Sequence, residues 1–313
     1  INIIVYNYFN FKYKLILMER KIYLTLLGGL GNQLFQYACG INLAYKLNAK
    51  LIIDYKTGFT FDNIFKRNLS LPQKLKFNKI NFFSLIFLFC IRLIKKLFFK
   101  NKIYLKFFNL LIIDETNHAS DYLEDFYYKV KNAKYVYLIG FFQSEKYFSE
   151  NKKRIFNNIL NSEKNNKKIL EASKKIKNKS LMMGIRMYEE APKNLKQSFG
   201  GLERFDFYNK SISIYKKKYK NLELFVFSSM NDEKWIKKKL TQKIDHFNAD
   251  KISKLNDTEA LIFCSNFKKY IISNSSFYWW AATLANHKNK IKIIYSKKFI
   301  NKSSIPKNWM TKF

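Results

Sequence analysis

Apolar residues near the start of the chain follow the pattern of a strand, a turn, a helix and a second strand. Residues 21–27 are apolar and rich in strand-forming types, which suits a buried strand. Apolar residues then recur at helical spacing over 32–48, and the run 51–54 predicts the next strand. This order of elements predicts the opening of a parallel α/β sheet.

Further strands and helices are predicted from residue 135 onward, and the regular alternation restarts beyond residue 176. Strands are predicted at 135–140, 181–186, 222–227, 270–273 and 291–295, and helices at 145–176, 204–219, from 232, at 257–265 and from 275. The lysine-rich helix over 145–176 is expected to bridge the two halves. Two α/β halves joined near residue 178 imply a cleft between them, which is a usual place for a ligand.

This pattern predicts two domains, over 21–178 and 179–313. Residues 60–133 follow the alternation poorly and are expected to form an insertion in the first domain. The chain does not begin with Met, and Met18 stands just before the first predicted strand. Our hypothesis is that Met18 is the natural start, so residues 1–20 are expected to be a non-native or disordered extension.

An apolar run at 80–91 lies within the expected insertion. About a dozen residues are too few to span a bilayer, and the run is followed by four basic residues: Arg92, Lys95, Lys96 and Lys100. One interpretation is a basic amphipathic helix that lies on an acidic membrane surface. The slightly favoured alternative is a buried helix of the insertion.

The net charge of +35 opens one further class of function. Clustered Lys and Arg neutralise phosphates in nucleic-acid-binding proteins. Lys, Asn, Ile, Phe and Tyr are all in excess together, however, as codon bias in an AT-rich genome would produce. The lysines also occur in many short runs, so codon bias is the favoured explanation, and charge alone decides neither fold nor function.

Cysteine and histidine usage excludes several classes of site. The three cysteines, Cys39, Cys90 and Cys264, lie far apart in the sequence, and the three histidines are scattered. A disulfide framework is therefore not expected, and a reducing compartment fits. No zinc or haem signature occurs, so no metal site is predicted.

The first candidate for chemistry is the turn L-G-G-L-G-N-Q at 27–33. Glycine permits positive φ and lets a ligand approach the backbone closely. The helix that follows offers free N–H groups and a positive dipole end, which suit an anion such as a diphosphate. The amides of Asn32 and Gln33 can bond a nucleotide or a sugar. The alternative is a tight strand-to-helix turn with no ligand.

The second candidate is M-G-I-R-M-Y-E-E at 183–190, which ends a strand in the middle of the chain. Arg186 can hold phosphate oxygens with two parallel hydrogen bonds. Glu189 and Glu190 place carboxylates beside it, and a carboxylate near a cleft can act as a general base. An ordinary surface loop with an Arg–Glu pair explains the same residues equally well.

The third candidate is I-I-S-N-S-S-F-Y-W-W at 271–280, where a strand ends and a helix begins. Ser hydroxyls and the helix N-terminus make an anion site at Asn274, Ser275 and Ser276. The two tryptophans that follow are interpreted as core. Asp257 opens the preceding helix, where it either contacts a purine or ribose or serves the helix dipole, which is the favoured role.

Five segments of the chain occur in a fixed order. They are G-G-L-G-N-Q-L-F-Q-Y-A (28–38), G-F-F-Q-S-E-K-Y-F (140–148), F-V-F-S-S-M (225–230), S-N-S-S-F-Y-W-W-A (273–281) and P-K-N-W (306–309). In this order they resemble the motifs of glycosyltransferase family 11, the bacterial alpha-1,2-fucosyltransferases and their relatives. The resemblance runs from about residue 21 to the C-terminus.

The resemblance implies an α/β fold of the GT-B-like kind, in which two Rossmann-like domains face a cleft. It implies GDP-fucose as donor, a galactose-type hydroxyl of a glycan as acceptor, and an alpha-1,2 linkage formed with inversion and without a metal or other cofactor. The product would be a surface polysaccharide or O-antigen. The protein would be cytoplasmic or peripheral on the inner face of the cytoplasmic membrane, and its acceptor can be lipid-linked. Peripheral contact with an anionic membrane fits this location. Nucleic acid is not expected as a partner.

One segment departs from the family. The usual central motif is His-x-Arg-Arg-x-Asp, and this chain has Gly184, Ile185, Arg186, Met187, Tyr188 and Glu189 in its place. The retained Arg186 can still stabilise the leaving diphosphate, and Glu189 can inherit the acidic role. A fixed cation is missing, which a nearby lysine or Arg204 would have to replace.

The resemblance and the residues together assign roles. Arg186, Ser275 and Ser276 would hold the diphosphate, Asn32 would reach across from the N-terminal, acceptor-side half, and Asp257 would contact guanine or ribose. Glu189 is the first candidate for the general base and Glu190 the second. The remaining expected substrate contacts are Gly29, Gly31, Gln33, Gln143, Ser228 and Asn274. The alternatives are a transferase for another GDP-sugar and a non-catalytic basic protein that binds nucleic acid or a membrane surface.

Overall fold

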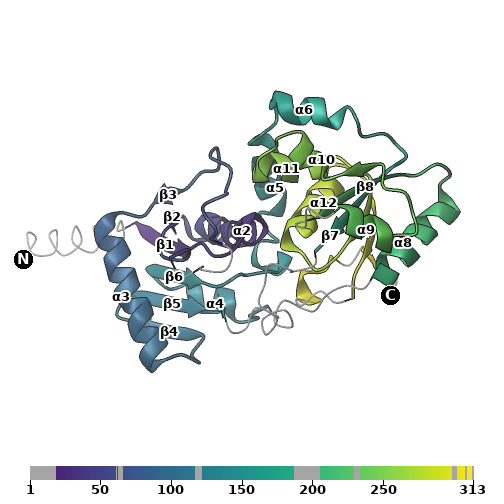
Figure 1. The fold of residues 1–313 in the computed structure, drawn as a ribbon. Coiled ribbons are helices and arrows are strands. Elements are labelled where there is room, and N and C mark those ends of the chain that lie inside the picture. Colours follow the sequence, from purple (N-terminus) through teal and green to yellow (C-terminus); the bar gives the residue numbers. More distant parts are fainter. Residues whose placement is uncertain are drawn as a thin grey trace, which may run out of the picture.

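The computed structural model describes residues 19–60, 62, 66–116, 122–186, 205–228, 233–297, 302–306 and 309–311. The predictions for residues 1–18 therefore lie outside the described residues, whereas Arg20, expected to belong to the extension, begins the first strand. Two six-stranded sheets stand side by side, each covered by helices (Figure 1). The α/β class and the two Rossmann-like units that the sequence indicates are confirmed.

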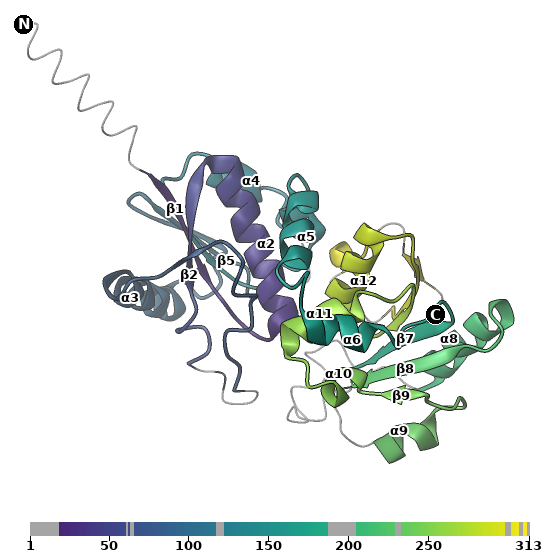
Figure 2. The same ribbon diagram turned by 90° about the horizontal axis from the view of Figure 1, so that it is seen from above.

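The N-terminal sheet has the strand order β3-β2-β1-β6-β5-β4, and among its described strands only β4 runs antiparallel. Its strands are β1 (Arg20–Thr25), β2 (Ala49–Asp54), β3 (Asn78–Lys79), β4 (Tyr104–Phe107), β5 (Leu110–Asp114) and β6 (Tyr135–Ile139). Helix α2 (Leu30–Leu47) covers one face and α3 (Phe82–Phe98) the other, with the short α4 (Phe126–Val130) at the edge of the unit (Figure 2). The segment 60–133, expected as an insertion, thus supplies strands of this sheet.

The C-terminal sheet has the strand order β12-β11-β10-β7-β8-β9, and every pair in it is parallel. Its strands are β7 (Ser180–Ile185), β8 (Glu223–Ser228), β9 (His246–Phe247), β10 (Lys269–Ile272), β11 (Lys292–Tyr295) and β12 (Met310–Thr311). Its helices are α8 (Phe205–Lys218), α9 (Glu233–Lys239), α10 (Ala249–Ile252), α11 (Asp257–Cys264), α12 (Ser276–Lys288) and the 3-10 turn η4 (Lys302–Ser304). This is the doubly wound order of dinucleotide-binding folds. The strand order reverses between β7 and β10, and this place is the topological switch point of the sheet.

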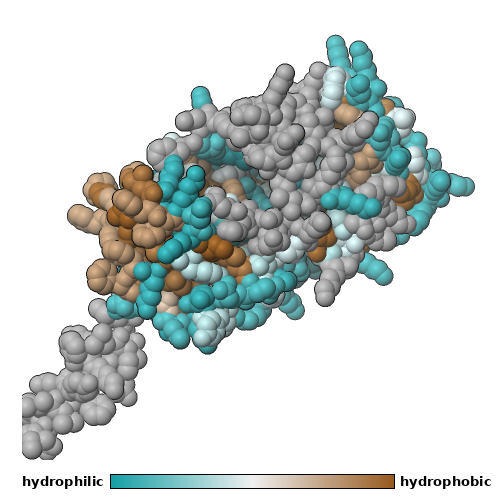
Figure 3. All heavy atoms as spheres, turned by 90° about the horizontal axis from the view of Figure 1, so that it is seen from below, coloured by the Kyte–Doolittle hydropathy of each residue, from teal (hydrophilic) through white to brown (hydrophobic). Residues whose placement is uncertain are grey.

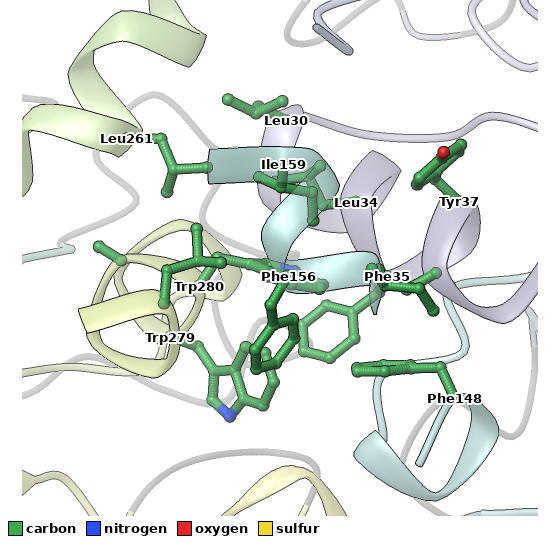
Figure 4. Packing of buried hydrophobic residues seen from close by; sticks show 14 of the residues in the cluster. Leu30, Leu34, Phe35, Tyr37, Phe148, Phe156, Ile159, Leu261, Trp279 and Trp280 are labelled. Atoms are coloured by element: carbon green, nitrogen blue, oxygen red, sulfur yellow. The ribbon is translucent and has the colours of Figure 1, made fainter. Parts of the chain in front are cut away.

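A single hydrophobic cluster joins the two halves. Phe35 of α2, Phe148 and Phe156 pack around Trp279 and Trp280 of α12 (Figure 4). Both tryptophans are fully buried, which confirms their interpretation as core. Burial of this aromatic area fixes α2 against α12. The domain boundary near residue 178 stays a prediction.

The single helix predicted over 145–176 is wrong. The segment forms a 3-10 turn, η2 (Glu145–Tyr147), and two helices, α5 (Lys152–Asn161) and α6 (Lys167–Ser173). Asn166 ends the continuity because its side chain accepts a hydrogen bond from the Lys168 N–H, 3.0 Å, as the N-cap of α6. It also donates to Glu259, which fixes α6 against α11.

The buried helix favoured for residues 80–91 is also wrong. These residues begin α3, whose outward side carries exposed aromatic and aliphatic residues. No helix within the described ranges has the length and apolar character needed to cross a membrane.

Candidate functional site at the two switch points

The switch point of the C-terminal sheet gathers the second and third candidate motifs. Strands β7 and β10 are neighbours, with Gly184 paired to Ile272, so Arg186 and Asn274 leave the sheet side by side. The Arg186 N–H donates to the Ser273 hydroxyl oxygen, 3.0 Å, and that hydroxyl donates to the Gly184 carbonyl, 3.1 Å. Ligands of doubly wound sheets bind at the carboxyl ends of strands at such a point.

The switch point of the N-terminal sheet lies between β1 and β6. The glycine turn follows β1, and the loop Gly140 to Gln143 follows β6. Asn32 and Gln143, two residues singled out from the sequence, meet here: Gln143 Nε2 donates to Asn32 Oδ1, 2.8 Å. Both side chains are half-buried. The amide pair stands at the carboxyl edge of the N-terminal sheet, because Asn32 follows β1 and Gln143 follows β6.

The two switch points touch one another through Gly31. A β-carbon on Gly31 would lie 2.5 Å from the Ser276 carbonyl carbon, 2.6 Å from Ser276 Oγ and still closer to the Phe277 backbone nitrogen. Only glycine permits this approach of the first turn of α2 to the first turn of α12. Gly28 has a φ of +71°, which lets the chain turn into α2 without strain. The clustering of glycines is thus explained by a turn and by a contact between halves.

The two helices that meet lack side-chain caps. Gly29 is the N-cap of α2 and Ser275 that of α12, and neither makes a side-chain cap hydrogen bond. Helix α11, by contrast, has a complete capping box made by Asn256 and Glu259. Uncapped first-turn N–H groups and two positive dipole ends therefore converge where an anion would be stabilised.

Arg67 adds a cation that the sequence motifs did not indicate. A β-carbon on Gly29 would lie 2.7 Å from Arg67 Nη1, so the half-buried guanidinium rests against the N-cap of α2. No local pattern marks Arg67, because it stands in an irregular segment and meets the glycine turn only in the folded chain. Arg204, the other candidate cation, lies outside the described residues.

Glu115 is a second residue that the motifs missed. It follows β5 and is fully buried, and its Oε2 accepts hydrogen bonds from the Phe141 N–H, 2.9 Å, and the Phe142 N–H, 3.2 Å. Its Oε1 has no hydrogen-bond partner among the described residues. A β-carbon on Gly140, at φ +140°, would lie 2.7 Å from Oε2. The carboxyl therefore shapes the loop that carries Gln143.

Burial raises the pKa of the Glu115 carboxyl from 4.5 to about 7, with a further rise from the charge of Asp114 and an opposing effect of the two N–H bonds. Burial raises the pKa of Cys39 in α2 and of Tyr147 in η2, and the charge of Glu115 in turn raises both further. The signal available in the sequence was an acidic pair directly after an apolar strand.

Replacing Glu115 by Gln should change how stability depends on pH. Between pH 4.5 and 7 the unfolded chain has lost this proton and the folded chain keeps it, so stability falls as the pH rises. The expected fall is roughly 3 kcal/mol in the native protein, and Glu115→Gln should not show it. Urea unfolding at several pH values, with the exposed Glu150→Gln as control, measures the difference. Equal pH slopes in the native protein and Glu115→Gln would contradict the assignment.

Around Ser228 the structure adds a further acidic side chain. The Ser228 N–H donates to Asn248 Oδ1, 2.8 Å, and Lys251 Nζ donates to the Ser228 carbonyl, 3.4 Å. Asp250 lies in the same turn, burial raises its pKa, and its Oδ1 has no partner among the described residues. Asp257 lies exposed at the first turn of α11, so its expected role in binding stays a prediction.

Gln33 has an evident structural role. It is fully buried, its Nε2 donates to the carbonyls of Gly28, 2.9 Å, and Asn68, 2.8 Å, and its Oε1 accepts from the Ser70 N–H, 2.9 Å. These bonds hold the segment that carries Arg67 against the glycine turn. Whether Gln33 also contacts substrate stays a prediction.

Two expected catalytic residues, Glu189 and Glu190, lie outside the described residues. Where the chain is described, no three His, Cys, Asp or Glu side chains gather as metal ligands would. The arrangement brings together Arg186, Ser276, Gly31, Asn32 and Gln143. It suits an anionic ligand held between two helix N-termini.

Comparison with known proteins gives consistent matches. The family model described as glycosyl transferase family 11 matches residues 21–312. The alpha-1,2-colitosyltransferase of Escherichia coli is 30% identical over 267 residues, which cover 84% of this chain and 87% of that protein. Among solved structures, a point mutant of Arabidopsis thaliana FUT1 in complex with GDP superposes with a TM-score of 0.51 at 11% identity, over 90% of this chain and 71% of that one. The fucosyltransferase NodZ from Bradyrhizobium gives 0.46 at 14% identity, over 85% and 93%.

Proposed function

We propose, since the chain belongs to glycosyl transferase family 11 and is a glycosyltransferase, that it transfers fucose from GDP-fucose to a galactose-type hydroxyl of a glycan. The new linkage would be alpha-1,2, formed with inversion. The observation that carries the proposal is the contact of Gly31 with Ser276 and Phe277, which brings two uncapped helix N-termini together. A diphosphate between two sheets is the anion that such a site suits.

The donor's diphosphate is assigned to the C-terminal switch point. Negative charge develops on the departing GDP, so groups that hold the diphosphate stabilise the transition state. These groups are the Arg186 guanidinium, the first-turn N–H groups of α12 and the hydroxyls of Ser275 and Ser276. Arg67, beside Gly29, is proposed as the cation that replaces the arginine missing at Met187.

The guanosine is assigned to the end of β8 and the turn that follows β9. Asp257 remains a candidate there. Asp250 is added because its buried Oδ1, without a partner among the described residues, can accept a hydrogen bond from a ribose hydroxyl or a guanine N–H. Ser228 and Asn274 flank this side of the proposed site.

The acceptor is assigned to the N-terminal half. The amide pair of Asn32 and Gln143 would orient the donor sugar or the acceptor hydroxyl, beside the backbone of Gly29 and Gly31. The acceptor oxygen attacks the anomeric carbon from the side opposite GDP, so the carbon inverts in one displacement. Positioning supplies much of the rate. Glu189 is the first candidate to accept the hydroxyl proton, and Glu190 is the second.

A second donor has specific support. The similar Escherichia coli protein is a colitosyltransferase, and colitose differs from fucose in lacking the 3-hydroxyl. A pocket that bonds a 3-hydroxyl rejects the sugar without it, because its polar groups would be left unpaired. One pocket is therefore expected to favour one of the two sugars. The alternative function is transfer of colitose from its GDP-sugar to the same kind of acceptor.

The test is GDP release with three donors, GDP-fucose, GDP-colitose and GDP-mannose, over a panel of galactose-ended acceptors in EDTA. Acceptor-dependent release from GDP-fucose, with little from GDP-mannose, is the expected result. Faster turnover of GDP-colitose would establish the second candidate instead. Release from no donor, by a folded protein that also fails to bind GDP, would refute both.

A further inference from the structure

Helix α3 and the β4–β5 hairpin expose a large apolar surface at one end of the molecule (Figure 3). On α3, Phe83 is 82% exposed and Leu97 is 75% exposed, and at the hairpin tip Phe108 is 86% exposed. Phe82, Phe98 and Phe107 extend the same surface, which we name the aromatic patch. A globular protein rarely leaves so many aromatic side chains in water without a partner for them.

The orientation of α3 is fixed by its inner side. Leu88 and Ile91 pack on β5 and β6, and the buried Lys95 pairs with Asp114 at 2.8 Å. Turning the helix to bury its aromatic side would leave Lys95 and Asp114 without this ion pair, which is costly for a buried charge. The exposure of the aromatic patch is therefore set by the fold.

The surroundings of the patch are strongly basic. Residues 63–113 contain eleven Lys and Arg and no Asp or Glu. Lys96 and Lys100 near the end of α3, Lys102 after it and Lys106 on β4 are all exposed beside the patch. Two copies of this surface would repel one another, whereas an anionic partner with an apolar interior would match both its charge and its apolar side chains.

A groove enters the patch between α3 and the hairpin. It has a volume of about 420 Å³ and is lined by Phe87 and Leu88 of α3 and by Phe107 and Phe108 of the hairpin, among others. Such an apolar groove can receive a segment of a lipid acyl chain, while the lysines remain at the level of the headgroups.

We propose that α3 and the β4–β5 hairpin form a docking surface for an anionic lipid bilayer. The surface lies on the face of the N-terminal sheet opposite α2 and away from the C-terminal sheet (Figure 2). Docking therefore leaves Arg186 and Ser276 uncovered. The proposal does not depend on the identity of the sugar donor.

Vesicle flotation with the full chain tests the proposal. Vesicles of phosphatidylcholine with about one third phosphatidylglycerol should carry the protein upward, pure phosphatidylcholine should carry little, and added salt should reduce binding.

Because the whole chain is basic, the patch itself must be shown to enter the bilayer. Cys90 of α3 is exposed while Cys39 and Cys264 are buried, so an environment-sensitive dye on Cys90 reports from this surface. Its emission should shift to the blue on the anionic vesicles.

Two sets of variants separate the apolar and the charged contributions. The apolar set replaces three side chains together: Phe83→Asn, Leu97→Asn and Phe108→Asn. It should lower the partition coefficient at least tenfold, because three apolar side chains can no longer be buried in the bilayer. Lys96→Gln, Lys102→Gln and Lys106→Gln together should lower it at least as much, at about fivefold for each lysine. The matched apolar control is Leu170→Asn on α6, where the side chain is 57% exposed, and the matched basic control is Lys216→Gln, Lys217→Gln and Lys218→Gln together on α8.

The expected result is loss of binding in both patch sets and near-native binding in both controls, with unchanged melting temperature and GDP release on a soluble acceptor. Equal loss in the α8 control would overturn the proposal, because binding would then be unspecific attraction to charge. Absence of binding by the native protein at low salt would overturn it as well. A third outcome would assign the patch to a second copy of the chain instead. In it, the native protein dimerises without binding vesicles, and the three apolar substitutions abolish the dimer.

Discussion

Replacing Arg186 by alanine is expected to lower kcat/KM by about 30- to 1,000-fold, which corresponds to roughly 2–4 kcal/mol of lost transition-state stabilisation. The residue follows β7 at the switch point, beside the first turn of α12. Its guanidinium can hold two diphosphate oxygens in a fixed geometry, and the charge on them grows as GDP departs. The fold should persist, because it is the Arg186 backbone N–H that bonds Ser273.

Steady-state kinetics, with GDP affinity measured by calorimetry, checks this prediction. Arg186→Lys should fall between the native protein and Arg186→Ala, because it keeps the charge and loses the bidentate geometry. Arg154→Ala removes the same side chain from the exposed side of α5, where it stacks on Tyr45, and should leave kinetics unchanged. Native turnover in Arg186→Ala would refute the role of Arg186.

Gly31→Ala is expected to lower turnover by about 100-fold and the free energy of unfolding by about 1–3 kcal/mol. The added methyl group would meet the backbone of Ser276 and Phe277. Those atoms cannot move aside unless α12 moves from α2, and both helices are held by the aromatic cluster around Phe35 and Trp280. A displacement of about 1 Å at the reacting centre is enough for such a loss.

Gly40→Ala is the matched control, because it lies in the same helix and gains the same helix propensity, about 1 kcal/mol. Its methyl group would meet side-chain methyls of Leu51, at 2.9 Å, and Leu24, at 3.2 Å, which can adjust. Urea unfolding and GDP release on both variants make the comparison. If Gly31→Ala behaved like Gly40→Ala, the contact between the two switch points would not matter for function.

Much of the fold could be predicted from the sequence where the signal is local. The strand, glycine turn and helix at the start of the chain are found at β1 and α2, and the later strands appear at β7, β8, β10 and β11. Strands β4 and β5 lie in the segment 60–133, which was expected to be an insertion, and they were not predicted. The two-residue strands β3, β9 and β12 were also missed. A strand of two residues has no periodic pattern, and each of these forms beside a longer neighbour at or near a sheet edge.

The candidate site was predictable in the same uneven way. Arg186, Asn274, Ser275 and Ser276 follow recognisable strand ends, so their place at the carboxyl edge could be expected. Arg67 and Glu115 carry no motif, because their importance comes from contacts with Gly29 and with the loop after Gly140. The apolar run of α3 has apolar residues on both sides, so periodicity could not choose its buried face. The Lys95–Asp114 pair makes that choice.

By itself the sequence determined the α/β class, the two halves and the motifs that mark the family, since these depend on residues close together in the chain. Only the tertiary structure decided that the two switch points touch through Gly31, that Glu115 is buried beneath the loop of Gln143, and that the aromatic side of α3 faces solvent. The physical reason is that each of these depends on packing and charge pairing between segments that meet only when both sheets have formed.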